Sequence, residues 1–226
     1  MVNNTRGNQE DFYRGLLEKN KSGPGVVSSE SLAHKELRFS KISEIFKNDI
    51  SFSVHDIGMG IADFYNYIQN NLNDLNIKYS GTEILKEFVD ISKERYPDIN
   101  FYHQDIAESP SDKIYDYVIF SGVFHQRRGS SIGDWEKFSQ NLISNAFKMS
   151  KKGIAFNFIS PFVDFYQTEV YYCNMHKLIE FINSDLSRFF EIKHNYALYE
   201  FTIFVYKEEY IKEKNPQNEF KKYFNV

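Results

Sequence analysis

Two glycines placed one residue apart, directly after an apolar run that ends in an acidic residue, constrain this 226-residue chain more than any other feature. The stretch reads Val54-His55-Asp56-Ile57-Gly58-Met59-Gly60, and a helix-like segment follows it. This order predicts a buried strand whose carboxyl end turns sharply into a helix. Glycine is needed at such a turn if the backbone is to approach a ligand without a Cβ atom in the way. The sequence therefore predicts a nucleotide-like ligand above this turn.

The residue three positions after the second glycine narrows the class of ligand further. In the dinucleotide-binding pattern GxGxxG, the third position is glycine or alanine, and here it is Asp63. The turn therefore favours an adenosyl group over the pyrophosphate of NAD.

Strand and helix signals alternate through most of the chain. Strands are expected at 52–57, 77–84, 101–106, 115–121, 154–159, 190–194 and 199–206, and helices at 61–75, 87–95, 135–149 and 178–190. Ser150-Lys151-Lys152-Gly153 is expected to cap the third of these helices. Such alternation predicts an α/β fold with a mostly parallel sheet covered on both faces, and the last two strands predict an antiparallel hairpin.

The flanks differ from this central region. Residues 1–50 are expected to form a helical extension with a Gly/Pro/Ser-rich loop at 19–25, residues 51–207 the main domain, and residues 208–226 a charged tail.

Composition excludes several classes of function. The net charge is −4 and the pI is near 5.9, so no basic excess attracts nucleic acid. No membrane span is expected, and Cys173, the single cysteine, allows no intrachain disulfide, so we expect a cytoplasmic protein. The six histidines show no HxH or HExxH spacing, and we expect no metal.

These motifs resemble those of class I S-adenosylmethionine-dependent methyltransferases, over roughly residues 52–206. Asp56-Ile57-Gly58-Met59-Gly60 is similar to the family's first motif, and segments 79–84, 101–106, 115–122 and 150–157 resemble its later strand ends. More narrowly, the chain resembles an uncharacterised group of small bacterial methyltransferases. The resemblance implies a Rossmann-like, seven-stranded fold and S-adenosylmethionine as cofactor.

Each part of that cofactor has a candidate partner. Glu83, followed by Ile84, is suited to the two ribose hydroxyls because a carboxylate accepts both hydrogen bonds. Asp105 is suited to the adenine amine, with Ile106 packing on the ring, and Arg38 to the methionine carboxylate. Ser121 and Gly122 follow the fourth strand and are expected beside the methyl donor, and Asp56, Gly58 and Gly60 complete the cofactor set.

The acceptor side is less constrained. His125 follows the fourth strand and is a candidate general base, because its ordinary pKa lies near neutrality. Candidate acceptor-binding residues are Tyr13, Arg127, Asn157, Tyr172 and His194. For each of these side chains, packing or a structural hydrogen bond is an alternative explanation.

The expected reaction is methylation of a small polar metabolite, at oxygen rather than nitrogen, in polysaccharide or natural-product biosynthesis. The protein is expected to be a monomer or a homodimer. The alternatives are N-methylation of a small molecule, an NAD-dependent oxidoreductase, and a catalytically silent methyltransferase-like binding subunit.

Overall fold

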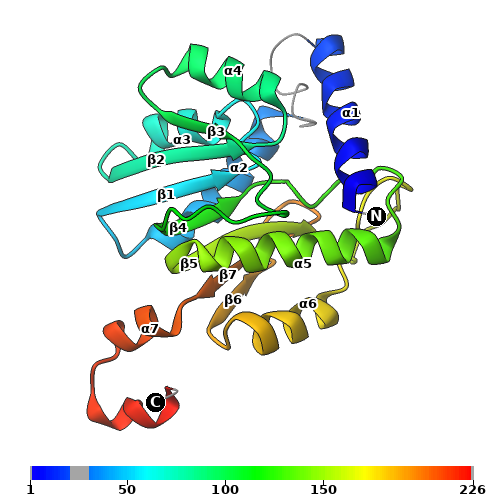
Figure 1. Ribbon diagram of the computed structural model, residues 1–226. Coiled ribbons are helices and arrows are strands. Elements are labelled where there is room, and N and C mark those ends of the chain that lie inside the picture. The colour runs from blue at the N-terminus through cyan, green and yellow to red at the C-terminus, as the bar shows by residue number, and fades with distance from the viewer. Residues whose placement is uncertain (1, 21–30, 225–226) are drawn as a thin grey trace.

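One seven-stranded sheet organises the computed structural model, which describes residues 2–20 and 31–224 (Figure 1). The strand order is β3-β2-β1-β4-β5-β7-β6. β7 runs antiparallel to β5 and β6, and the other neighbouring strands are parallel. The strands span Ser51–Ile57 (β1), Asn76–Glu83 (β2), Asn100–His103 (β3), Tyr115–Phe120 (β4), Ser150–Ile159 (β5), Phe190–Lys193 (β6) and Glu200–Tyr206 (β7). The predicted fold class, including the late antiparallel hairpin, is confirmed.

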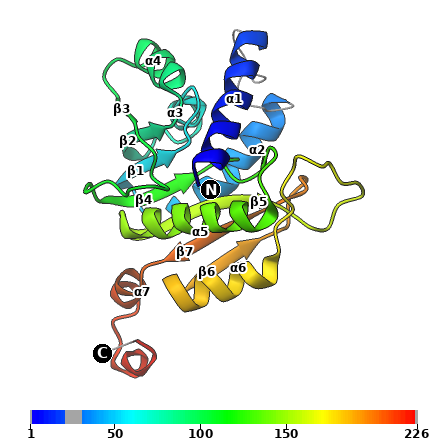
Figure 2. The same ribbon diagram turned by 45° about the vertical axis from the view of Figure 1, so that its right-hand side comes forward.

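Helices connect the strands and cover the two faces of the sheet (Figures 1 and 2). They are α1 (Val2–Asn20), α2 (Leu32–Ser43), α3 (Asp63–Asn71), α4 (Lys86–Arg95), α5 (Ile132–Lys148), α6 (Met175–Phe181) and α7 (Glu208–Lys214). A 3₁₀ turn (Glu44–Phe46) extends α2, a π-helical turn (Ile182–Leu186) extends α6, and a 3₁₀ helix (Asn218–Tyr223) follows α7.

The period of two along a strand divides the core between the two faces. In β4, Tyr117 and Ile119 belong to one apolar cluster, together with Phe39 of α2 and Phe64 of α3. Val118 and Phe120 point to the other face and belong to the cluster that contains Trp135 of α5. A strand buried on both faces has a nearly continuous apolar sequence, and Tyr117-Val118-Ile119-Phe120 is an example.

Several predicted boundaries were wrong: the helix expected over 61–75 spans 63–71, the strand expected over 101–106 ends at His103, and two further cases have a clear physical reason. α5 ends at Lys148 with Met149 as its cap, so Gly153 lies inside β5 and caps no helix. A Cβ atom at Gly153 would lie 2.6 Å from the Val205 carbonyl oxygen of β7, so the close approach of these strands requires glycine there. The helix expected over 178–190 ends at Leu186, because the next residue, Ser187, has an extended backbone.

The N-terminal helix stands across the end of the sheet at which the parallel strands finish (Figures 1 and 2). Gln9 donates a hydrogen bond to the Gln126 carbonyl oxygen beyond β4, and Arg14 pairs with Glu87 of α4. Of the loop predicted at 19–25, Lys19 and Asn20 end α1 and the remainder lies outside the described residues.

Candidate active site

A cavity lies over the carboxyl ends of β1, β2 and β4, where open α/β sheets bind their ligands. Every residue predicted from the sequence to hold the cofactor lines it: Arg38, Asp56, Gly58, Gly60, Glu83, Ile84, Asp105, Ile106, Ser121 and Gly122. The candidate base His125 and the candidate acceptor residue Tyr13 line it as well.

The glycine turn that follows β1 forms part of the cavity lining. Gly58 and Gly60 have φ values of +68° and +57°, in the left-handed region that favours glycine. The Gly58 amide donates to the Thr82 carbonyl oxygen at 2.9 Å, which ties the turn to β2. Ala62, which caps the start of α3, also adopts a left-handed conformation with φ +61°. This third left-handed residue of the turn was not predictable from the sequence, because alanine rarely adopts that conformation.

Glu83 is held rigidly at the end of β2. Its Oε2 accepts the Gly60 amide at 3.0 Å, and its Oε1 accepts the amides of Ile84 and Leu85. Burial raises the pKa of Glu83, and these three amides oppose the shift. The two carboxylate oxygens together have about four lone pairs, and the three amides use three of them, so the fixed carboxylate keeps one acceptor position for a ribose hydroxyl.

Asp56 carries an unsatisfied acceptor into the same cavity. Its Oδ2 accepts the Tyr79 hydroxyl at 2.8 Å, whereas its buried Oδ1 has no partner among the described residues. Burial raises the pKa of Asp56 to about 7. A cationic ligand group, such as the ammonium of the methionine portion, would satisfy Oδ1 and favour the ionised form.

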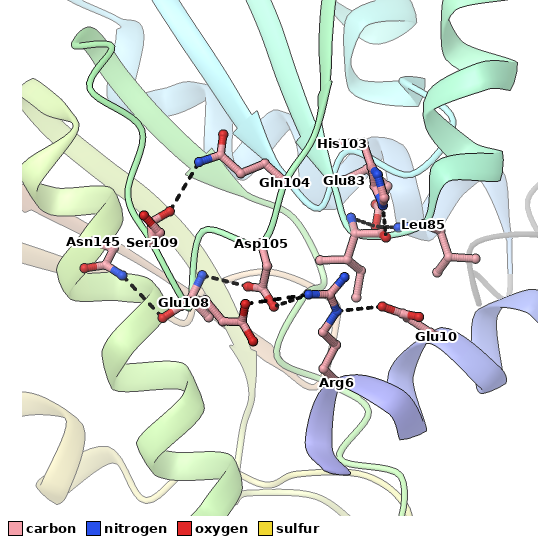
Figure 3. Close-up of polar contacts among 12 residues, drawn as sticks. Arg6, Glu10, Glu83, Leu85, His103, Gln104, Asp105, Glu108, Ser109 and Asn145 are labelled. Atoms are coloured by element: carbon pink, nitrogen blue, oxygen red, sulfur yellow. Dashed lines mark hydrogen bonds and ion pairs between the residues drawn. The ribbon is translucent and has the colours of Figure 1, made fainter. Parts of the chain in front are cut away.

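At Asp105, the residue predicted to bind adenine, the cavity lining contacts α1 (Figure 3). Asp105 Oδ1 accepts the Ala107 amide at 2.9 Å, and Oδ2 lies 3.6 Å from Arg6 Nη1. Arg6 also pairs with Glu10 of its own helix and lies 3.8 Å from Glu108. Asp105 therefore stabilises its own turn and contacts the N-terminal helix, and it still faces the cavity.

Four side chains from distant parts of the chain form a buried network beside Gly122. Glu200, the first residue of β7, accepts hydrogen bonds from Arg38 Nε and Nη2 and from the Asn157 amide. His125 Nε2 lies 3.1 Å from the Asn157 amide nitrogen and 3.8 Å from Glu200 Oε2. Burial disfavours the charge on Glu200, yet the electrostatic influence of His125 and Arg38 and the hydrogen bonds from Arg38 and Asn157 hold its pKa below the ordinary value.

Arg38 keeps one donor available despite this pairing. Nη1 forms no hydrogen bond within the described part of the chain, and it lies 3.3 Å from the position a Cβ atom at Gly122 would occupy. Gly122 has φ +78°. Arg38 can therefore bind Glu200 on one side and a ligand carboxylate on the other, because a guanidinium carries five N–H donors.

Three predicted acceptor residues lie away from the cavity lining. The Arg127 guanidinium donates to the carbonyl oxygens of Ser130 and Thr168. The Tyr172 hydroxyl accepts a hydrogen bond from the Gln167 amide. The His194 ring packs against the rings of Phe162 and Phe201. Asn157 is buried beneath the cavity, in the network described above.

Sequence reasoning missed Glu200, Gln9 and Lys35. Glu200 is the first residue of β7, and the only indication in the sequence was an acidic residue at the start of a mainly apolar strand. Gln9 and Lys35 line the cavity from helices α1 and α2, and Lys35 pairs with Asp63 at 2.6 Å. Polar residues on helices carry no comparable signal, because most of them face solvent.

The residues present fit S-adenosylmethionine. The cavity offers a fixed acid for the ribose, an unsatisfied acid for the ammonium, a guanidinium Nη1 for the carboxylate, and the buried Ser121 hydroxyl, which lacks a partner among the described residues. Within residues 2–20 and 31–224, no cluster of three or more His, Cys, Asp or Glu side chains is placed to ligate a metal. Across the same residues, no helix is long and apolar enough to cross a bilayer.

The strand order and the position of the cavity define the class I methyltransferase fold. No family model matches the chain. "Putative methyltransferase Rv1506c" of Mycobacterium tuberculosis is 26% identical over 161 residues, which cover 69% of this chain and 93% of that protein.

Solved methyltransferase structures share the fold. Magnesium protoporphyrin IX methyltransferase from Synechocystis, with bound S-adenosylmethionine, gives a TM-score of 0.63 at 11% identity over 90% of this chain and 97% of its own. The 1,6-didemethyltoxoflavin-N1-methyltransferase of Burkholderia thailandensis, with bound S-adenosylhomocysteine, gives a TM-score of 0.63 at 8% identity over 92% and 90%. The resemblance to class I methyltransferases is confirmed.

Proposed function

We propose that this protein transfers the methyl group of S-adenosylmethionine to an oxygen atom of a small polar metabolite, of the kind made in polysaccharide or natural-product biosynthesis. The observation that carries the proposal is the convergence of all the expected cofactor residues on one cavity. The similar proteins named above support methyl transfer. The proposed site of action is the cytoplasm.

Each group of the cofactor has a partner in the proposal. Glu83 binds the ribose, Asp105 and Ile106 bind adenine, and Asp56 and Arg38 bind the ammonium and carboxylate of the methionine portion. S-adenosylmethionine supplies an electrophilic methyl group on a sulfonium. The chain contributes by holding the acceptor close to that group and in line with the bond that breaks.

The N-terminal region supports this arrangement as a cover. α1 contacts segments that follow β3 and β4, through Arg6 with Asp105 and Gln9 with Gln126. The Arg128 guanidinium also stacks on the Phe12 ring, 3.6 Å from its centroid. We propose that the N-terminal extension, through α1 and α2, forms a cover over the cofactor and excludes water from the sulfonium.

Ligand-dependent thermal unfolding tests the cofactor assignment, because a ligand that binds only the folded state raises its stability. S-adenosylhomocysteine is expected to raise the melting temperature, whereas NADH at the same concentration is not. Preference for NADH would refute the proposal. Glu83→Gln is expected to weaken the response to S-adenosylhomocysteine, because an amide offers only one acceptor atom. The surface variant Glu94→Gln serves as the control.

A further inference from the structure

The orientation of the Asn157 amide is fixed by a backbone group. The Gly122 N–H lies 2.8 Å from the amide oxygen of Asn157. A backbone N–H can only donate, so the oxygen must face Gly122 and the NH₂ group must face the opposite side. Asn157 is 1% exposed, and no solvent competes for these bonds.

The two hydrogens of that NH₂ group have two acceptors. One is Glu200 Oε2, and the other is His125 Nε2 at 3.1 Å. An amide nitrogen cannot accept a hydrogen bond, so His125 Nε2 must be the unprotonated nitrogen of the ring. Neutral His125 therefore carries its proton on Nδ1.

Nδ1 is the nitrogen left for a ligand. It has no hydrogen-bond partner within residues 2–20 and 31–224, and His125 lines the cavity next to Gly122 and Val123. Burial lowers the pKa of His125 to about 4, with Arg38 acting in the same direction and Glu200 opposing it. At neutral pH the ring is an uncharged donor through Nδ1. The lone pair on Nε2 already accepts a hydrogen bond from the Asn157 amide.

The carboxylates that line the cavity are engaged elsewhere. Asp63 pairs with Lys35 and Arg95, Glu83 accepts three backbone amides, and Asp105 accepts the Ala107 amide near Arg6. Asp56 lies on the cofactor side, at the end of β1. Among the described residues, the end of β4 therefore offers donors to an acceptor and no unengaged carboxylate placed to take its proton.

We propose that His125 donates its Nδ1–H to an acceptor that arrives as a carboxylate, so that the product is a methyl ester. This inference rests on the proposed methyl transfer. A carboxylate oxygen lone pair forms the new O–CH₃ bond, the S–CH₃ bond breaks, and its electron pair stays on sulfur. No proton moves, and the sulfonium and carboxylate charges disappear together.

The wall contributed by α5 favours that step. Trp135, Phe138 and Leu142 line the cavity, and Trp135 is fully buried. Apolar surroundings disfavour separated charges, so they favour a reaction in which two opposite charges are neutralised. Asn157 acts as a positioning residue, since it sets the tautomer of His125 without reaching the cavity itself.

Nitrogen-15 NMR of histidine-labelled protein tests the tautomer directly, without cofactor or acceptor. His125→Gln assigns the His125 signals among those of the six histidines. The expected result is a neutral ring protonated at Nδ1; protonation at Nε2 would overturn the inference. Asn157→Asp places an acceptor opposite Nε2 and is expected to move the proton to Nε2. Thr202→Val, at the position paired with Asn157 on β7, is the matched control and should retain the wild-type tautomer.

The acceptor class has its own test. Enzyme and S-adenosylmethionine with a radiolabelled methyl group are incubated with 3-phenylpropionate, 3-phenylpropanol or 3-phenylpropylamine, which share one apolar scaffold. The acid is expected to become labelled, and mild alkali is expected to release this label as volatile methanol. Preferential, alkali-stable labelling of the alcohol or the amine would overturn the inference. Failure of S-adenosylhomocysteine to stabilise the protein would instead refute the proposed function, and the NMR result would remain readable.

Discussion

Replacing Gly58 with alanine tests whether the glycine turn is constrained by both backbone and packing. Gly58 has φ +68°, and an added Cβ would lie 2.6 Å from Val123 Cγ2. A left-handed backbone costs a residue with a Cβ roughly 1–2 kcal/mol, and overpacking costs about 1–3 kcal/mol. Gly58→Ala is therefore expected to lower the free energy of unfolding by roughly 2–5 kcal/mol, a large part of the stability of a typical domain.

Urea denaturation followed by circular dichroism measures this change, and Val123→Ala separates its two components. The double variant loses the contact with Cγ2 and retains the backbone strain. The double variant is therefore expected to be more stable than the sum of the single effects by about 1–3 kcal/mol. Gly133→Ala is the control, because a Cβ at Gly133 meets nothing within 4 Å, and α5 accepts alanine readily.

Two results would refute this reasoning. If Gly58→Ala were as stable as Gly133→Ala, neither the positive φ nor the close contact would constrain the turn. If the Gly58 and Val123 effects were strictly additive, the backbone alone would account for the cost.

Three further predictions concern buried charges. Glu200→Gln leaves the buried Arg38 cation without its ionic partner and is expected to lower the free energy of unfolding, measured by urea denaturation, by about 3–5 kcal/mol. The control is Asp90→Asn in the exposed pair with Lys86, which is expected to cost about 1 kcal/mol or less. Equal costs would contradict a buried pair. The folded-state pKa of His125 near 4 lies below its ordinary 6.5, so the unfolded chain binds more protons between these values. Stability should fall as pH decreases from 6.5 to 4, and His125→Gln should reduce that fall; an unchanged profile would be evidence against a buried neutral ring. The folded-state pKa of Asp56 near 7 lies above its ordinary 3.8, so without cofactor stability should fall as pH rises from 3.8 to 7. Asp56→Asn should flatten that part of the profile, and a steeper one would be inconsistent with the burial of Asp56.

Local sequence pattern determined most of the fold and many of the residues that line the cavity. Alternation of apolar strands with amphipathic helices specifies a parallel sheet, since each element must bury its own apolar residues. The Gly58 turn, Glu83 and Asp105 were predictable because each lies at the end of a strand, and the carboxyl ends of parallel strands meet at one edge of the sheet.

Local sequence pattern was misleading where the same residues are compatible with two different local structures or roles. Gly153 follows a helix and looks like a cap, yet it is required by the carbonyl of Val205, which lies 52 residues further along the chain (205 − 153). Arg127 follows β4 as an acceptor-binding residue would, but neighbouring carbonyls occupy its guanidinium.

The sequence by itself determined the class of fold and the residues, predicted to hold the cofactor, that line the cavity. Only the tertiary structure decided the state of His125, because its partners come from elsewhere. Asn157 lies on β5, Glu200 on β7 and Arg38 on α2, and they meet only after the antiparallel β7 pairs with β5. A tautomer depends on the hydrogen bonds that a ring makes in space, and no spacing along the chain encodes them.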